Sequence, residues 1–414
     1  NAGLGYRALS APSNAGANNT AVGFDALLSN TTADNNTAVG AYALDANTTG
    51  GNNAGVGYAA LGANTTGINN IAMGSYAGDA NTTGHYNVAL GVLSLTANTT
   101  ADGNTSVGYG AMSSNTTGAN NTGIGREALA ANTTGIDNVA IGYAALTANT
   151  TATNNVAVGK IALYSNTTGS ENIAIGNSAL RACTTGTANI GIGYLALDAI
   201  TTGTDCIAIG AYSLDVNTAN HNVGIGRSTL SANTTGTQNV AVGSNALAVN
   251  TTANDNVAIG YQALTANTTG AENTAIGGYQ TLGTNTTGSY NTAVGRLALW
   301  KATTADNNVA VGKSAGAALT TGQDNTFIGT SAGDTCTTGS DNLCVGKNCD
   351  VQATGSGSRI GIGNDLTLTT NNTAYIGVGG NNISSLFASG SSWSWTSDER
   401  LKKNINTDTL GLEF

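Results

Sequence analysis

Residues 36–52 read Asn-Thr-Ala-Val-Gly-Ala-Tyr-Ala-Leu-Asp-Ala-Asn-Thr-Thr-Gly-Gly-Asn, and this 17-residue pattern recurs along most of the chain. We take the glycine that follows the aliphatic residue, Gly40 in this copy, as the anchor of each repeat. Most anchors lie 17 residues apart, with single steps of 16 or 18, at positions 5, 23, 40, 57, 74, 91, 108, 125, 142, 159, 176, 193, 210, 226, 243, 260, 277, 295, 312, 329, 346 and 363. Such a period is typical of a protein whose repeats stack on one another.

Three columns of residues indicate which way the side chains point. The position before each anchor is a large aliphatic in every copy (Leu4, Val22, Met73, Ile362), and most copies have Leu or Met four residues after it (Leu27, Leu44, Met112, Leu163). These two columns can meet if each repeat makes one turn. The position two before the anchor is almost always Ala, Gly or Ser. Because neighbouring residues of a strand face opposite ways, we expect this small column on the other face, where another chain can approach closely.

The pattern predicts an all-β fold, a repetitive parallel β-solenoid or β-roll with coils of about 17 residues over a shaft of 22 repeats, residues 1–363. Each repeat is expected to supply two short strands, Thr-Ala-Val-Gly and Ala-Leu-x-Ala, joined by Asn/Gly turns. A coil with little more than one Val and one Leu has a thin core, so lateral association is expected to stabilise it. With the small face as the contact, we predict a homotrimeric fibre.

The composition limits the partners. Charged residues make up 9% of the 414 residues and the net charge is −10, which argues against nucleic acid because phosphate binding needs clustered Lys and Arg. No apolar run is long enough for a membrane span, and no signal peptide is visible. Residue 1 falls inside a repeat, so we expect the natural chain to begin earlier. Neither a cofactor nor a metal site is predicted, and small filling residues are favoured over a disulfide or metal site for Cys183, Cys206, Cys336, Cys344 and Cys349.

Two asparagine columns are expected to hold the coils together. Asn lies four before the anchor in all copies but two, as in Asn36, Asn70 and Asn172, and such a column can form a structural ladder of amide hydrogen bonds. A second Asn, seven after the anchor, begins Asn-Thr-Thr and matches the glycosylation sequon. Because Ile200 and Leu319 take its place in other copies, we expect this column to face inward.

The remaining columns favour solvent-exposed positions over binding or catalytic sites. The position after the anchor carries rings in some copies and charges in others, as in Tyr58 and Arg126, which favours a solvated outer column over glycan stacking. The two Thr of each repeat are adjacent, so an ice-binding array is disfavoured. His85 and His221 are isolated and the carboxylates are scattered over columns expected to be exposed, so nothing in the repeats indicates catalysis.

The repeat resembles the head repeats of trimeric autotransporter adhesins, whose coils read Asn-x-Ala-Ile-Gly. The resemblance covers residues 1–363 and implies left-handed parallel β-rolls assembled in threes. The unit here is longer and carries the Asn-Thr-Thr-Gly turn.

After Gly363 the period is lost, and residues 364–396 are expected to form a neck. Residues 397–405 then read Ser-Asp-Glu-Arg-Leu-Lys-Lys-Asn-Ile. This string resembles the opening of the intramolecular chaperone auto-processing domain of endosialidase-type phage tail spikes and fibres. The resemblance implies that residues 397–414 begin a chaperone that trimerises the chains and then cuts itself off before Asp398, with Ser397 as nucleophile and Lys402 as general base. Apart from this autoproteolysis in a complete precursor, we predict no enzymatic activity.

The expected function is therefore the structural shaft of a phage tail fibre or tail spike on the virion tail. Its partners would be two further copies of the chain and a host surface receptor, either a glycan or an outer-surface protein. A cellular surface adhesin or extracellular filament at the cell surface is the alternative. An ice- or glycan-binding solenoid is the third hypothesis.

Overall fold

The computed structural model describes residues 1–352, 357–386 and 394–395, and it is an all-β parallel solenoid of about 22 coils, each about 17 residues long. The chain forms two compact units, Asn1–Thr234 and a second unit that begins at Thr235. The described residues include no helix that is long and apolar enough to cross a membrane. The predicted fold class is confirmed.

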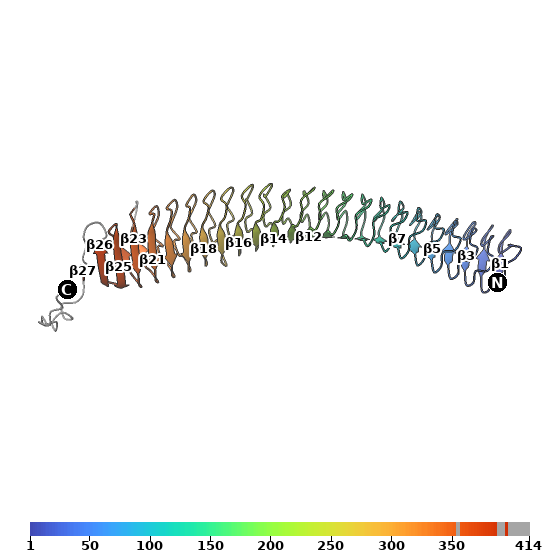
Figure 1. Ribbon diagram of the computed structural model, residues 1–414, viewed down its shortest axis with the longest axis horizontal. Helices are drawn as coiled ribbons and strands as arrows, with labels where there is room; N and C mark the ends of the chain where they lie inside the picture. The colour runs from blue at the N-terminus through green and yellow to red at the C-terminus, as the bar shows by residue number, and fades with distance from the viewer. Residues whose placement is uncertain (353–356, 387–393, 396–414) are drawn as a thin grey trace, which may run out of the picture. The chain divides into compact units, whose positions relative to one another are not determined.

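Unit 1 contributes one three-residue strand per coil, and successive strands lie side by side (Figure 1). They pair in parallel and in register, so that Thr20, Ala21 and Val22 lie opposite the equivalent residues of the next coil. The strands are β1 (Ala2–Leu4), β2 (Thr20–Val22), β3 (Thr37–Val39), β4 (Ala54–Val56), β5 (Ile71–Met73), β6 (Val88–Leu90), β7 (Thr105–Val107), β8 (Thr122–Ile124), β9 (Val139–Ile141), β10 (Val156–Val158), β11 (Ile173–Ile175), β12 (Ile190–Ile192), β13 (Ile207–Ile209) and β14 (Val223–Ile225).

Unit 2 begins with the same kind of parallel strand ladder and ends with antiparallel strands. Its strands are β15 (Val240–Val242), β16 (Val257–Ile259), β17 (Thr274–Ile276), β18 (Thr292–Val294), β19 (Val309–Val311), β20 (Thr326–Ile328), β21 (Asn342–Val345), β22 (Asp350–Val351), β23 (Arg359–Ile362), β24 (Thr367–Leu368), β25 (Thr373–Val378), β26 (Asn381–Leu386) and β27 (Ser394–Trp395). The parallel ladder passes from β21 to β23 and on to β25. Strand β26 then pairs antiparallel with β25, and β27 with β26. The parallel pairing therefore extends beyond residue 363.

The anchor glycine makes the sharp bend at the end of each strand. Gly23 has a φ of +144°, and a Cβ on it would lie 2.4 Å from the carbonyl oxygen of Gly40 in the next coil. Both the backbone conformation and the close approach of the neighbouring coil therefore require a residue without a side chain. This explains why glycine holds the position in every repeat.

The expected orientation of the strands was wrong. The small middle residues Ala21 and Ala38 are fully buried inside the coil, whereas Val22 and Val39 are each 37% exposed on the outside. The physical reason is space, because the interior next to the strand is already filled by the neighbouring turn. A Cβ at Gly55, which occupies the same column, would lie only 3.3 Å from Leu44 Cγ.

The second predicted strand is also absent, since these segments form turns. Leu27 and Leu44 lie in the left-handed region, with φ values of 51° and 52°, and both are fully buried. The left-handed conformation costs about 1–2 kcal/mol per residue, and burial of a leucine side chain contributes about 1.5–3 kcal/mol. Burial of each leucine therefore offsets the cost of its own left-handed conformation.

Phe327 is the large exception in the small column, and it is fully buried. Two coils beside it lack the usual leucine and have Gly316 and Gly333 at that position. A Cβ at Gly316 would lie 2.8 Å from the Phe327 ring, and one at Gly333 would lie 2.4 Å from it. The ring therefore fills the volume that leucine fills in other coils.

Candidate functional site

The Asn column four before the anchor is buried and binds coil to coil. The backbone N–H of Asn53 donates to Asn36 Oδ1 at 2.9 Å, and that of Asn70 donates to Asn53 Oδ1 at 2.9 Å. Nδ2 also donates to a backbone carbonyl oxygen in many coils, as Asn70 does to Gly84 (2.8 Å) and Asn172 to Gly186 (2.8 Å), whereas Asn36 Nδ2 donates to Asn19 Oδ1 (3.2 Å). The side-chain amides of Asn36, Asn70 and Asn172 thus form hydrogen bonds with backbone groups of neighbouring coils.

The second Asn column is equally buried and forms a ladder of side-chain amides. Asn64 Nδ2 donates to Asn47 Oδ1 at 2.8 Å and to the Gly67 carbonyl oxygen at 3.1 Å. Because both amides are fully buried, they are closed to glycosylation in the folded chain. Asn166 Oδ1 has no hydrogen-bond partner within the described structure, since Cys183 holds the position of the donor in the following coil.

The outer strand face is an exposed surface rich in apolar side chains in each unit. We define it as the first and third residues of β2–β20, which are almost all Val, Ile or Thr. The third residues of many strands are a third or more exposed: Val22, Val39, Met73, Ile124, Ile141, Ile175, Ile209 and Ile225 in unit 1, and Ile259, Ile276, Val311 and Ile328 in unit 2. Parallel sheets in most proteins are covered on both faces, so this uncovered face requires an explanation.

The two threonines of each pair differ in their hydrogen bonding and exposure. The first hydroxyl, as in Thr48, donates to the carbonyl oxygen of Thr65 in the next coil at 3.1 Å. The second threonine of the pair is exposed, as at Thr49. The two hydroxyl columns therefore do not form one flat, matched array.

An aromatic stripe runs along the N-terminal coils of unit 1. Neighbouring ring centroids in Tyr6, Phe24, Tyr42, Tyr58 and Tyr76 lie 5.2–5.7 Å apart. The stripe is not evident from the sequence because its rings are divided between the first and second positions after the anchor. Each ring packs on its neighbours, so the rings of the stripe already have aromatic partners within the chain.

An ion pair accompanies the stripe. Arg7 lies over the Tyr6 ring at 5.4 Å and pairs with Asp25, and Arg7 Nε donates to Asp25 Oδ1 at 2.8 Å. Asp25 is only 3% exposed, so the expectation that it lies on an exposed column was wrong.

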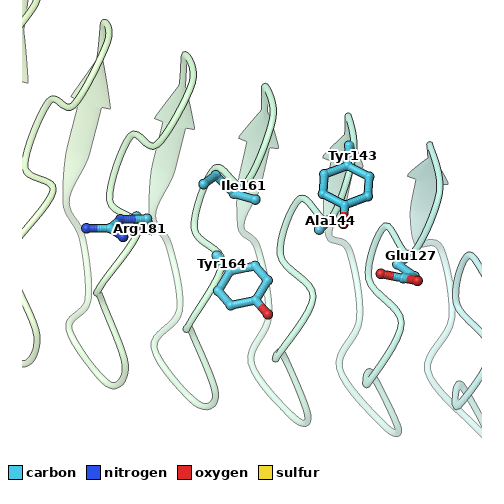
Figure 2. A pocket seen from close by; sticks show the side chains of 6 residues that line it. All are labelled: Glu127, Tyr143, Ala144, Ile161, Tyr164 and Arg181. Atoms are coloured by element: carbon cyan, nitrogen blue, oxygen red, sulfur yellow. The ribbon is translucent and has the colours of Figure 1, made fainter.

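A recess of about 230 Å³ lies on the turns that follow β8–β11. It is lined by residues of four successive coils (Figure 2): Glu127, Tyr143, Ala144, Ile161, Tyr164 and Arg181. Arg181 makes a two-point ion pair with Asp198, at 2.8 and 2.9 Å. Glu127 accepts from its neighbour Arg126 at 3.0 Å. Sequence reasoning missed this recess because it depends on the relative sizes of side chains in three different columns, one, two and five residues after the anchor.

The titratable groups of the described residues do not gather into a catalytic or metal centre. No group of three or more His, Cys, Asp or Glu that could hold a metal occurs among them. His85 Nδ1 accepts the backbone N–H of Ile68 at 3.0 Å, a structural contact. All five cysteines are buried and free. Burial raises the pKa of Cys183 and of Cys336 to about 11, which makes both thiols poor nucleophiles.

The predicted processing residues Ser397, Asp398 and Lys402 lie outside the described residues. Comparison with protein-family models, with curated proteins and with solved structures finds no match to this chain. The class is defined by the fold itself: the chain is a parallel β-solenoid repeat protein.

Proposed function

We propose that the chain is the shaft of a homotrimeric phage tail fibre or tail spike, in which three copies associate through their outer strand faces. The observation that supports this proposal is the uncovered apolar face of the parallel sheet. The C-terminal resemblance to the chaperone of endosialidase-type tail proteins supports the phage assignment. The column of small residues two before the anchor is buried inside the coil, so it cannot be the surface through which chains associate.

The size of the outer strand face in unit 1 is at the upper limit for an apolar patch on an ordinary monomer. Three residues span about 10 Å and strands lie about 4.8 Å apart, so the face of unit 1 alone covers roughly 600 Å². The largest apolar patch on an ordinary monomer is about 300–600 Å², and a stable interface covers about 800 Å² per partner. The expected partner of this face is the same face of another copy of the chain, because every coil repeats the same spacing of side chains.

The interior gives a second reason for lateral association. Ala and Leu fill one part of each coil and asparagine amides fill the rest, so the apolar area buried per coil is small. Covering Val and Ile side chains on the outside adds about 25 cal/mol for each Å² removed from water. A shaft assembled this way is stiff enough to hold a receptor-binding part, for a glycan or an outer-surface protein of the host, away from a virion.

The test is the mass of the chain in solution. We expect light scattering after size exclusion to give three times the mass of one chain. The double substitution Ile141→Lys and Ile175→Lys places like charges in the interface and is expected to give monomers. The matched control, Thr151→Lys with Thr185→Lys, adds the same charge on the exposed turn and should leave the trimer intact. A monomeric wild-type chain would contradict the proposal.

In a longer precursor, we expect the chaperone to be released at the Ser397–Asp398 bond. Hydrolysis breaks the bond between the Ser397 carbonyl carbon and the Asp398 nitrogen: one water supplies the oxygen of the new Ser397 carboxylate and a proton for the Asp398 amine. Ser397 and Lys402 take the nucleophile and general-base roles that the resemblance implies. Mass spectrometry of the mature protein should then find Ser397 as its last residue, and Ser397→Ala should leave the precursor whole. Uncut wild-type precursor in assembled particles would refute this step and leave the fibre proposal standing.

A cellular surface adhesin or extracellular filament is the second candidate, and the resemblance of the repeats to adhesin heads favours it. The two candidates differ in where the protein resides. Peptides of the chain in purified virions would support the first, and peptides in the cell envelope fraction of uninfected cells would support the second.

A further inference from the structure

We propose that the recess formed by Glu127, Tyr143, Ala144, Ile161, Tyr164 and Arg181 is a binding subsite for one neutral sugar ring of a surface glycan. This inference rests on the proposed function, since it gives the shaft a contact of its own with a host surface. The recess is distinct from the outer strand face, because all six residues follow an anchor glycine rather than lie on a strand.

The recess exists because the repeat varies locally. Its floor is Ala144, two residues after its anchor, where the neighbouring coils carry the larger Glu127 and Ile161. Its side is made by Tyr164 and Arg181, five residues after their anchors, a column that holds only Ala130 and Thr147 in the two preceding coils. The result is a recess among the six side chains labelled in Figure 2.

The two tyrosines supply the apolar contact. Tyr143 and Tyr164 are 45% and 42% exposed, and within the described structure neither packs against another aromatic ring, although the Arg126 guanidinium lies over the Tyr143 ring at 5.7 Å. They differ in this respect from the rings of the N-terminal stripe. One face of a sugar ring is lined by C–H groups, which pack on an aromatic face, and the tyrosine hydroxyls remain available for hydrogen bonds.

The two ends of the recess supply polar partners of opposite kinds. Glu127 at one end accepts hydrogen bonds and Arg181 at the other donates them (Figure 2). Their coils are three steps apart, about 14 Å along the axis, so a single ring beside the tyrosines bonds through its hydroxyls to one of the two groups. Each charge is already balanced, Arg181 by Asp198 and Glu127 by Arg126. A charged ligand would therefore gain little net attraction, whereas a neutral polyol would find fixed donors and acceptors.

The size agrees with a single ring. Sites for drug-sized molecules measure about 300–1,000 Å³, and this recess is smaller, at about 230 Å³. One such contact is weak, but three copies in a trimer would present three subsites and raise the overall affinity by multivalency.

The experiment is a binding assay on the whole chain with an array of neutral oligosaccharides from bacterial surface polysaccharides, followed by calorimetric titration of the strongest oligosaccharide. We expect Tyr143→Ala and Tyr164→Ala each to weaken binding by about tenfold, and Glu127→Gln to weaken it less. Tyr109→Ala is the matched control. Tyr109 lies in the same column as Tyr143, is exposed and does not line the recess, so its loss should leave binding unchanged.

Two outcomes would overturn the inference: no oligosaccharide bound by the wild-type chain, or binding that both tyrosine variants retain in full. Light scattering on the same samples separates this failure from failure of the proposed function. A trimer that binds no oligosaccharide refutes only the subsite. A monomer refutes the fibre assignment whatever the array shows.

Discussion

At the scale of single residues, the interior of each coil is a close fit between large and small positions. Phe327 occupies a position held by Ala in most coils, and Gly316 and Gly333 replace leucines beside it. The three departures from the repeat compensate one another in volume.

Phe327→Ala is expected to destabilise the protein by about 3–5 kcal/mol, because the cavity would extend over two coils that already lack leucine. Chemical denaturation followed by circular dichroism measures the loss. Phe24→Ala removes an exposed ring of the same size and should cost far less. Equal effects from the two substitutions would contradict the compensation.

Asn70→Ala tests the inner amide ladder. The substitution removes the acceptor of the Asn87 backbone N–H, which lies 2.9 Å from Asn70 Oδ1. A buried donor without a partner costs about 1–3 kcal/mol, so the denaturation midpoint should fall. Thr66→Ala, on the exposed turn of the same region, is the control. An unchanged midpoint for Asn70→Ala would show that the ladder contributes little.

At the scale of the coil, each strand from β2 to β13 of unit 1 pairs with its equivalents in the neighbouring coils, so a coil there is a removable unit. Deleting residues 36–52 joins Asn35 to Asn53 and brings β2 against β4 in the existing register. We expect a folded chain that is only slightly less stable, as in other repeat proteins. Deleting residues 36–44 instead, about half a coil, should disrupt folding, because a one-residue shift already reverses the faces of a strand. Circular dichroism and thermal melting compare the two. Similar melting temperatures for both deletions would contradict this view of the coil.

The period, the strand at Thr-Ala-Val and the inward direction of the second Asn column could be predicted from sequence, because they depend on local rules that repeat from copy to copy. The orientation of the strand could not, since Ala and Val both suit a strand and only the room inside the coil decides between them. The leucine turns were missed because left-handed φ values are rare in non-glycine residues, and burial compensates them only after the coils have stacked. The recess was missed because it depends on residues five after the anchor in two coils combined with residues one and two after the anchor in others.

At the scale of the molecule, charge is sparse and negative, and several carboxyls resist ionisation. Burial raises the pKa of Asp45, Asp79, Asp215 and Asp334 above the ordinary value. The folded chain therefore binds protons more tightly than the unfolded chain, and its stability rises as pH falls through the raised pKa values.

We expect the melting temperature to be higher at pH 4 than at pH 7. Replacing Asp45, Asp79 and Asp215 with Asn should reduce the difference, since the pKa of each is raised first by burial. Calorimetry at the two pH values is the measurement. A melting temperature that falls toward pH 4 in the wild-type chain would show that other groups dominate.

The side-chain amide ladder has a mechanical consequence. In unit 1 it passes through Asn30, Asn47 and the following coils as far as Asn166, and it is interrupted where Cys183 and Ile200 replace the amides. A load applied along the axis would be carried by hydrogen bonds acting in series, and the steps that lack this bond would open first. Such a chain would yield under tension at places set by its own sequence, sparing the remaining coils.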